Sequence, residues 1–274
     1  MARPLPIFAL IFLLSGTAAA QEMLPDGGVA EGMGLKAWYA APTERYPHGI
    51  LGDAIEAGSL IVERDGDTLR YDLPEDSVFE DLTPRIVDAD GDGEPEILTI
   101  RSYLDGGATI ALFGIRAGAI TLLAEAAPIG TANRWLNPAG VADFDGDGDP
   151  EIAVIRTPHI GGILILYTWD RSSGRLVEES RKNGYSTHAI GSRALGLSLV
   201  IDWDGDGVTD LMVPRQDRKE LVALSMAGGQ FQEIGIFKLR REIIGDLELL
   251  GNFVKIPLKG GLNRTLARPY PKKK

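Results

Sequence analysis

The sequence predicts an all-β fold, a β-propeller of about five blades, with four blades as the alternative. Three observations predict it. A nine-residue acidic pattern occurs three times, starting at residues 88, 143 and 202, so the copies lie 55 and 59 residues apart. Each copy is followed by short apolar segments that are separated by glycines. Repeats of about this length that hold several short strands are typical of propeller blades.

The middle repeat can be followed from end to end. Residues 138–144 are predicted to form a strand that leads into the acidic pattern, and three strands follow at 151–156, 162–170 and 175–180. Glycine-containing turns separate these strands, as in a run of hairpins. The repeats on either side have the same order. Their predicted strands are 96–101, 108–115, 119–126, 210–214, 220–226 and 231–239.

Weaker versions of the repeat occupy both ends of the chain. Residues 46–62 resemble a pattern-bearing segment, but their acids are reduced to Asp53 and Glu56, so no ion is expected there. The remaining predicted strands are 68–73 and 77–82 near the N-terminus and 245–258 and 265–269 near the C-terminus. Counting both weak repeats gives the five units.

The ring of blades is expected to close, because unpaired sheet edges promote aggregation. Residues 35–41 are apolar enough to form an outer strand that completes the last blade. Residues 21–34 are rich in Gly, Asp and Met and are expected to form a loose lead-in. We therefore expect residues 35–270 to form one propeller domain.

The acidic pattern has the chemistry of a calcium loop. Its acids stand at positions 1, 3, 5 and 9 and its glycines at positions 4 and 6. Calcium takes six to eight oxygen ligands, and carboxylates gathered at one point repel each other unless a cation lies between them. Glycine tolerates the positive φ of a tight loop. Position 7 varies in chemistry, which fits a ligand from the backbone carbonyl. The alternative is a plain polar turn without an ion.

The calcium loop of an EF-hand begins with the same D-x-D-G-D-G pattern, but the rest of the EF-hand pattern is absent here. It needs a bidentate Glu at position 12 and a helix on each side. Position 12 is Thr99, Val154 and Val213 in the three copies, and the flanking segments are β-rich. The loops are therefore predicted to join strands.

The N-terminus has the features of a bacterial secretory signal. A charged start is followed by an apolar run from Leu5 to Leu14 and then by Ala18-Ala19-Ala20, which predicts a signal peptide over residues 1–20 with cleavage after Ala20. The apolar run is shorter than the roughly 20 residues that span a membrane. No membrane span is expected in the mature chain, and the protein is predicted to be periplasmic or secreted.

Net charge restricts the classes of partner, and cysteine content restricts the sources of stability. The formal net charge is −11, but the three acidic patterns hold fourteen of the 39 acids, and the balance without them is +3. The acidity is thus local and does not indicate a basic partner. No basic stripe suited to nucleic acid is found, and residues 271–274 form a predicted solvated basic tail. Because cysteine is absent, stability must come from the core or from metals. The protein is expected to be a monomer.

The pattern D-x-D-G-D-G-x-x-[DE] followed by an apolar strand, at 88–97, 143–152 and 202–211, resembles the FG-GAP/VCBS repeats of bacterial secreted proteins and of integrin alpha subunits. This resemblance implies a propeller with about three Ca²⁺ ions and a role in adhesion, ligand binding or assembly. It also implies the ligands. They are Asp88, Asp90, Asp92 and Glu96 with the Glu94 carbonyl, Asp143, Asp145, Asp147 and Glu151 with the Asp149 carbonyl, and Asp202, Asp204, Asp206 and Asp210 with the Val208 carbonyl.

Other candidate functional residues are few. His48, His159 and His188 each stand shortly before a glycine. A ring of blades could bring them together, but turn residues are the simpler expectation than a catalytic or zinc site. Arg134 and Arg193 both lie nine residues before a loop start, so they could share one face and grip a carboxylate or a sugar. The simpler expectation for both arginines is a salt bridge between blades or a solvated loop.

No catalytic motif points to an enzyme: the chain has no cysteine nucleophile, no G-x-S-x-G elbow and no phosphate-binding loop. We therefore expect a non-enzymatic, calcium-stabilised scaffold that binds a protein or a glycan. Two alternatives remain at this stage, a lyase-like enzyme that acts on polysaccharide and a purely structural module of an envelope assembly.

Overall fold

The computed structural model describes residues 22–269, which form strands and turns and no helix. The predicted signal peptide and basic tail lie outside these residues. Within them, no helix is long and apolar enough to cross a membrane. The all-β prediction is therefore confirmed for the described part of the chain.

The strands of the described residues can be grouped into five runs of consecutive antiparallel strands, which we number units 1 to 5. Unit 1 contains β1 (Ala30–Gly32), β2 (Leu35–Thr43), β3 (Glu56–Arg64) and β4 (Asp67–Asp72). Unit 2 contains β6 (Arg85–Val87), β7 (Glu96–Tyr103), β8 (Gly107–Arg116) and β9 (Ala119–Glu125). Unit 3 contains β10 (Leu136–Ala142), β11 (Glu151–Arg156), β12 (Ile163–Asp170) and β13 (Arg175–Asn183). Unit 4 contains β14 (Leu199–Ile201), β15 (Asp210–Pro214), β16 (Glu220–Ser225) and β17 (Gln232–Lys238). Unit 5 contains β18 (Glu248–Leu250), β19 (Phe253–Leu258) and β20 (Leu262–Ala267).

Short contacts join the first three units into one mixed, 13-stranded sheet. The strand β5 (Ser77–Phe79) pairs with β3 on one side and with β7 on the other. A single parallel pair, Arg175 with Glu125, joins β13 to β9. Units 4 and 5 are separate sheets of four and three strands.

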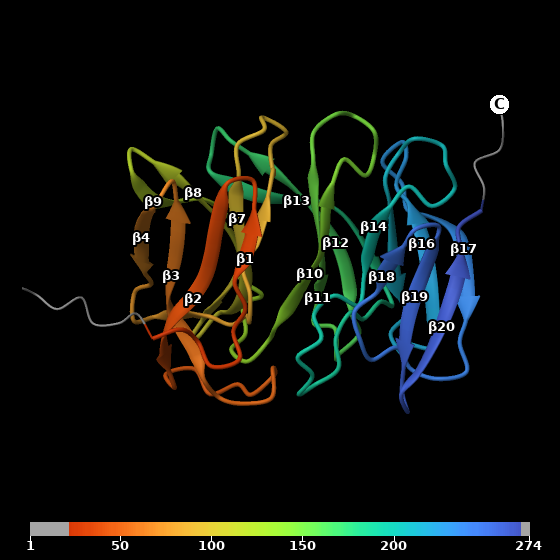
Figure 1. Cartoon of the computed structure of the whole chain (residues 1–274), viewed down its shortest axis with the longest axis horizontal. Coiled ribbons are helices and arrows are strands. Elements are labelled where there is room, and N and C mark those ends of the chain that lie inside the picture. The colour runs from red at the N-terminus through yellow and green to blue at the C-terminus, as the bar shows by residue number, and fades with distance from the viewer. Residues whose placement is uncertain (1–21, 270–274) are drawn as a thin grey trace, which may run out of the picture.

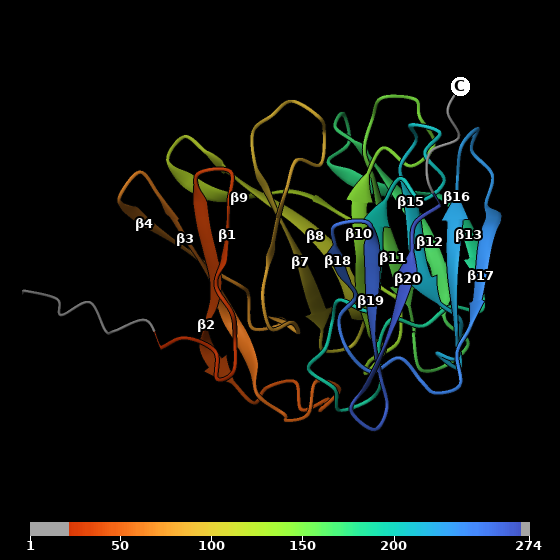
Figure 2. The same cartoon turned by 45° about the vertical axis from the view of Figure 1, so that its right-hand side comes forward.

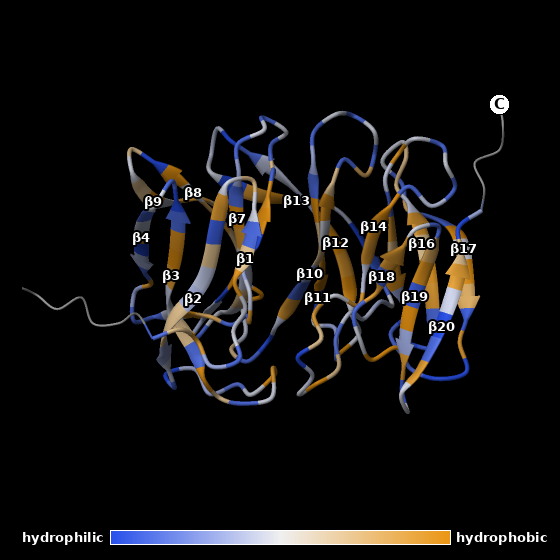
Figure 3. Cartoon of the chain, viewed as in Figure 1, coloured by the Kyte–Doolittle hydropathy of each residue, from blue (hydrophilic) through white to orange (hydrophobic). Residues whose placement is uncertain are grey.

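Each unit shares an apolar core with the next one. Successive side chains of a strand point to opposite faces, so β7 sends Ile97 into the core shared with unit 1 and Leu98 into the core shared with unit 3. Both side chains are fully buried. Strands that are buried on both faces appear in the sequence as continuous apolar runs. Figure 3 shows the result, with hydrophobic strands and hydrophilic connections between them.

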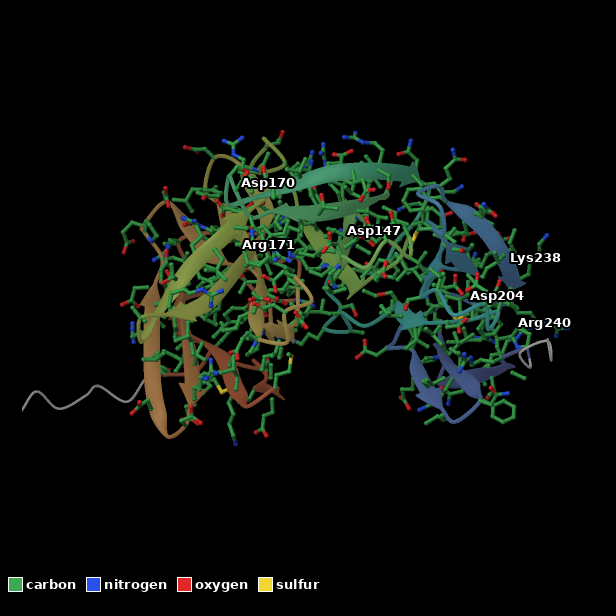
Figure 4. All side chains as sticks on the ribbon, turned by 90° about the horizontal axis from the view of Figure 1, so that it is seen from above. Asp147, Asp170, Arg171, Asp204, Lys238 and Arg240 are labelled. Carbon is green, nitrogen blue, oxygen red and sulfur yellow. The ribbon has the colours of Figure 1, made fainter. Side chains whose placement is uncertain are left out.

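The five units follow one another around an open arc, as Figure 4 shows from above. Unit 1 and unit 5 lie at its two ends, and no strand pair joins them within residues 22–269. Figure 2 gives a second view of the same separation, with β1–β4 on one side and β18–β20 on the other.

The prediction that residues 35–41 close the ring is wrong. They belong to β2, which pairs with β1 and β3 over a long register from Leu35 to Thr43. The apolar side chains of β2 are needed in unit 1, where Ala37 and Tyr39 are fully buried. The lead-in also differs from expectation, because residues 30–32 form β1 and Met23 makes a β-bridge with Ala40.

Candidate functional site

The three acidic patterns form the connections β6–β7, β10–β11 and β14–β15, here called loop 1 (88–96), loop 2 (143–151) and loop 3 (202–210). All three lie at one end of the sheets, the upper end in Figure 1, which we call the loop end. The glycines at positions 4 and 6 have φ between +70° and +101° in every loop, the left-handed region that glycine adopts without strain. They are Gly91, Gly93, Gly146, Gly148, Gly205 and Gly207.

The last acid of each loop is fixed beneath it. Its carboxylate accepts a hydrogen bond from the backbone N–H of position 2, at 3.0 Å for Glu96, 2.7 Å for Glu151 and 2.8 Å for Asp210. All three of these acids are at most 1% exposed. The residues at position 2 are buried, with exposed fractions of 2% or less for Ala89 and Phe144 and 4% for Trp203. The apolar position 2 and the first strand residue therefore fold each loop against the core.

The other acids organise the loop backbone in the same way each time. The carboxylate of position 1 accepts a bond from the N–H of position 6, the carboxylate of position 3 from position 5, and that of position 5 from position 7. These bonds turn several carboxylates toward one point in each loop. The loops are thus shaped by their own backbone before any ligand is considered.

Loop 2 brings together all four of its predicted side-chain ligands. Their oxygen atoms lie within 4.8 Å of one another. Loops 1 and 3 are less complete, because Asp92 lies outside the first group and Asp210 outside the third. The grouped acids are Asp143, Asp145, Asp147 and Glu151 in loop 2, Asp88, Asp90 and Glu96 in loop 1, and Asp202, Asp204 and Asp206 in loop 3.

The donor set fits a hard cation. Three buried carboxylate oxygens have no hydrogen-bond partner among the described residues: Oδ1 of Asp88, Oε1 of Glu96 and Oδ1 of Asp210. A buried polar atom without a partner is costly. Oxygen ligands, several of them ionised, are those that calcium prefers. These orphaned oxygens are therefore where a cation would restore the missing contacts.

The electrostatics of the loops support the same conclusion. Burial, with help from the neighbouring loop acids, raises the pKa of Glu96 and of Glu151 to about 7. Burial, with the same help from neighbouring acids, raises the pKa of Asp210 to about 6. Protons or a cation must offset this repulsion.

Each loop is also held by the following unit. The guanidinium of Arg171, which follows β12, donates to the carbonyl of Asp90 at 2.5 Å. Arg268, which follows β20, donates to the carbonyl of Asp202, and the N–H of Gly228, which follows β16, donates to the carbonyl of Asp145. Figure 4 shows Arg171 near Asp170 on the outer turn of unit 3. The loops therefore connect neighbouring units as well as neighbouring strands.

Arg134 and Arg193, which could have bound one carboxylate or sugar together, do not meet in one site. Arg193 lies 3.2 Å from Asp26 and 2.5 Å from Asp53, so its charge is neutralised by unit 1 and the segment before it. It lines a cavity of about 550 Å³ that is bordered by β6 and β10. Arg134 lines a different cavity. The simpler expectation, a salt bridge between units, is confirmed for Arg193.

The three histidines lie in connections between strands, as expected of turn residues, but the fold gathers them, which was the alternative. The ring nitrogens His159 Nε2 and His188 Nδ1 lie 2.9 Å apart, and the ring of Trp135 contacts both histidines. His48 and His159 line the same cavity of about 210 Å³, together with Arg134 and Trp135. Sequence spacing gave no signal for this cluster, because the connections that carry it are far apart in the chain.

Comparison with known proteins adds a family signal in the same region. Residues 88–154 match the family model of the FG-GAP-like repeat. The match runs from the start of loop 1 into β11 and so includes loops 1 and 2. No curated protein matches the chain.

One solved structure with a similar fold is the crystal structure of Sqt1 from Saccharomyces cerevisiae, with a TM-score of 0.52 at 12% identity. The match covers 90% of this chain and 60% of that one. At this identity the likeness shows the fold alone. It extends over nearly the whole arc of sheets, whereas the family match covers only one repeat and the loop of the next.

Proposed function

We propose that this protein is a non-enzymatic, calcium-stabilised scaffold, an open propeller-like arc of five blades that presents a surface to a protein or glycan partner. One observation carries the proposal. Three loops of the same geometry gather carboxylates at one end of the sheets, and buried oxygens in loops 1 and 3 have no hydrogen-bond partner among the described residues. The FG-GAP-like repeat at residues 88–154 supports the same function.

About three Ca²⁺ ions are proposed, one for each loop, held by the acids at positions 1, 3, 5 and 9 and the carbonyl of position 7. Bound calcium would supply the positive charge that these carboxylates lack, and the chain's own hydrogen bonds orient them for it. The proposed ligands are Asp88, Asp90, Asp92, Glu94 and Glu96, then Asp143, Asp145, Asp147, Asp149 and Glu151, and then Asp202, Asp204, Asp206, Val208 and Asp210.

We propose that such a scaffold works at the cell envelope. The predicted signal peptide supports a periplasmic or secreted location, where calcium is available and disulfides are not required. We propose that the mature protein works there as a monomer and that its units, fixed to one another through the loops, hold the partner-binding surface in shape.

Calcium titration by calorimetry tests the proposal. The wild-type protein is expected to bind three ions. Asp145→Asn should remove the loop 2 ion and leave the other two, because Asp145 belongs to the loop 2 cluster alone. Asp105→Asn is the matched control, since Asp105 is an exposed acid of the β7–β8 turn, and it should still bind three ions. A protein that takes up no calcium at any loop would contradict the proposal.

A further inference from the structure

The cavity of about 210 Å³ lies at the other end of the sheets from the acidic loops, and we call this the pocket end. Four connections form it: β2–β3, β9–β10, β11–β12 and β13–β14. Figure 1 shows the β2–β3 connection (orange) and the β13–β14 connection (teal) extending from the lower end of the sheets. Four connections that are far apart in the sequence thus meet around one cavity, and the calcium proposal uses none of its polar groups.

Hydrogen bonding fixes the tautomer of His159. Nε2 of His188 lies 2.8 Å from the carbonyl oxygen of Ser192, so this nitrogen carries the proton and donates. The other nitrogen of His188 must then accept from Nε2 of His159. The neutral ring of His159 is left with its lone pair on Nδ1. Burial lowers the pKa of both rings to about 4, so both are neutral at neutral pH.

His48 is oriented in a comparable way. Its Nδ1 lies 2.5 Å from Oε1 of Glu80, a fully buried carboxylate that also accepts from the hydroxyl of Ser102. With Nδ1 held by Glu80, Nε2 is the ring nitrogen of His48 that remains for a ligand. A buried partner that holds one ring nitrogen is a common way to aim the other at a ligand.

The remaining ring nitrogens of His48 and His159 are available to bind a ligand. Among residues 22–269, neither Nε2 of His48 nor Nδ1 of His159 has a protein hydrogen-bond partner, and neither is among the buried atoms left without one. Two ring nitrogens are fewer than the three or four protein ligands of ordinary zinc sites. A ligand with hydroxyl groups, which can donate or accept hydrogen bonds, therefore fits these two nitrogens better than a metal does.

The rim of the cavity carries a positively charged side chain and apolar surface instead of imidazole nitrogens. Arg134 and Asn133 are exposed there, and the single hydrogen bond recorded for the Arg134 guanidinium among the described residues goes to the neighbouring carbonyl of Asn133. Unlike Arg193, it is not neutralised by a carboxylate of the described chain. Ile160 and Ile190 stand beside it with 64% and 71% of their surfaces exposed. The rim thus offers a cationic fork and two apolar walls.

We propose that this pocket binds a polyhydroxylated carboxylate of the size of one sugar ring, of the hexuronate class. Its hydroxyls would hydrogen-bond with the free imidazole nitrogens of His48 and His159. Its carboxylate would accept hydrogen bonds from the guanidinium of Arg134, and its C–H surface would contact Ile160 and Ile190. A guanidinium that meets a carboxylate with two N–H groups gives strong and directional binding.

The size of the cavity limits the ligand. Pockets that enclose drug-sized molecules measure about 300–1,000 Å³, and this one is smaller. It takes a single ring, either as a free sugar acid or as the end of a glycan. The inference rests on the proposed scaffold function in that it names the class of partner, but the site shares no residue with the calcium loops.

Proton NMR of the histidine rings during titration with glucuronate tests the pocket, and the full calcium-loaded chain contains only three histidines to assign. We expect the resonances of His48 and His159 to move. Arg134→Ala should weaken binding by at least about tenfold, because a charge-assisted pair is lost. Arg240→Ala is the matched control, since Arg240 is an exposed arginine in the connection after unit 4 (Figure 4), and it should bind like the wild type.

Two further probes separate the parts of the ligand. Glucose lacks the carboxylate and propionate lacks the hydroxyls, so each should bind at least about tenfold more weakly than glucuronate. A uronate-terminated disaccharide that binds more tightly than glucuronate would indicate a glycan end, and weaker binding would indicate a free sugar acid. Histidine resonances that do not move at about 50 mM glucuronate would overturn the inference, because this concentration detects even weak binding. An unchanged affinity in Arg134→Ala would overturn it as well. Calcium content measured on the same sample shows separately whether the scaffold proposal holds.

Discussion

At the loop end of the molecule each acidic cluster comes from nine consecutive residues, whereas at the pocket end the polar groups come from connections spread between residues 48 and 190. The two ends also balance charge differently. At the pocket end the buried carboxylate of Glu80 is matched by donors from His48 and Ser102. At the loop end, carboxylates crowd together and some of their buried oxygens have no hydrogen-bond partner within residues 22–269.

This difference has a consequence for stability. A buried charge that is paired with protein groups contributes to stability under all ionic conditions. A cluster of carboxylates without such partners depends on a bound cation for its stability. We therefore expect the loop end to respond to calcium and the pocket end to be indifferent to it. The predictions below test this contrast.

The largest expected effect is that of chelation. At calcium concentrations about 1,000 times the dissociation constant, each site would add about 4 kcal/mol to the free energy of unfolding. For a domain of this size each kcal/mol is worth about 2–4 °C in melting temperature. Differential scanning calorimetry with and without EDTA is expected to show a fall of well over about 10 °C for three sites. An unchanged melting curve in EDTA would contradict the calcium proposal.

Phe144→Ala should have the next largest effect. Phe144 is fully buried at position 2 of loop 2 and its backbone N–H holds Glu151. Truncation of a buried Phe costs about 3–5 kcal/mol. Urea unfolding should also show a smaller calcium-induced gain in stability than in the wild type, because the loop loses its anchor. The control is Val177→Ala on the outer strand β13, where the side chain is 46% exposed and little change is expected.

Glu80→Ala examines the pocket end. It removes the acceptor of His48 and Ser102, and a buried donor left without a partner costs about 1–3 kcal/mol. Because the acidic loops lie at the other end of the sheets, the loss of stability should be the same in calcium and in EDTA. A loss that appears only in EDTA would show that the two ends are coupled, and the contrast between them would fail.

The pH dependence of the calcium-free protein should have an unusual sign. Glu96 and Glu151 have a pKa raised to about 7, and Asp210 to about 6, compared with about 4 in unfolded chains. Between these values the folded state binds more protons than the unfolded state, so its stability falls as the pH rises. The gain in melting temperature on adding calcium should therefore be larger at pH 7.5 than at pH 5. An equal gain at both pH values would argue against ionised ligands at position 9.

Arg171→Ala should have the smallest effect. Arg171 is an exposed side chain that holds loop 1 from unit 3, and exposed ion pairs contribute about 0–1 kcal/mol. Calorimetric titration should show weaker binding of one calcium ion only, the ion of loop 1. Equal weakening at all three loops would mean that Arg171 acts through the fold as a whole.

Much of the strand order could be predicted because its signals are local. The strands 151–156 and 210–214 were predicted with the bounds that the structure gives to β11 and β15. The acidic loops follow from spacing within nine residues, and the burial of Ala89, Phe144 and Trp203 follows from their place beside the core strands. In each case the physical cause, alternation of side chains or crowding of charge, lies within a short stretch of chain.

Long-range placement could not be predicted in the same way. The apolar segment 35–41 suits an outer strand of either end unit, and only packing decides that it fills the core of unit 1. The three histidines have no regular spacing in the sequence, yet the fold places His48 and His159 around one cavity and His188 in contact with His159.

The amino-acid sequence by itself determined the all-β units, the three acidic loops and the residues that fold them, because these depend on interactions between near neighbours. The tertiary structure alone decided that the arc stays open, that Arg193 is neutralised by Asp26 and Asp53, and that His48 and His159 face one pocket. Such contacts depend on how whole sheets pack against one another, a sum of many weak apolar contacts that no short pattern in the chain records.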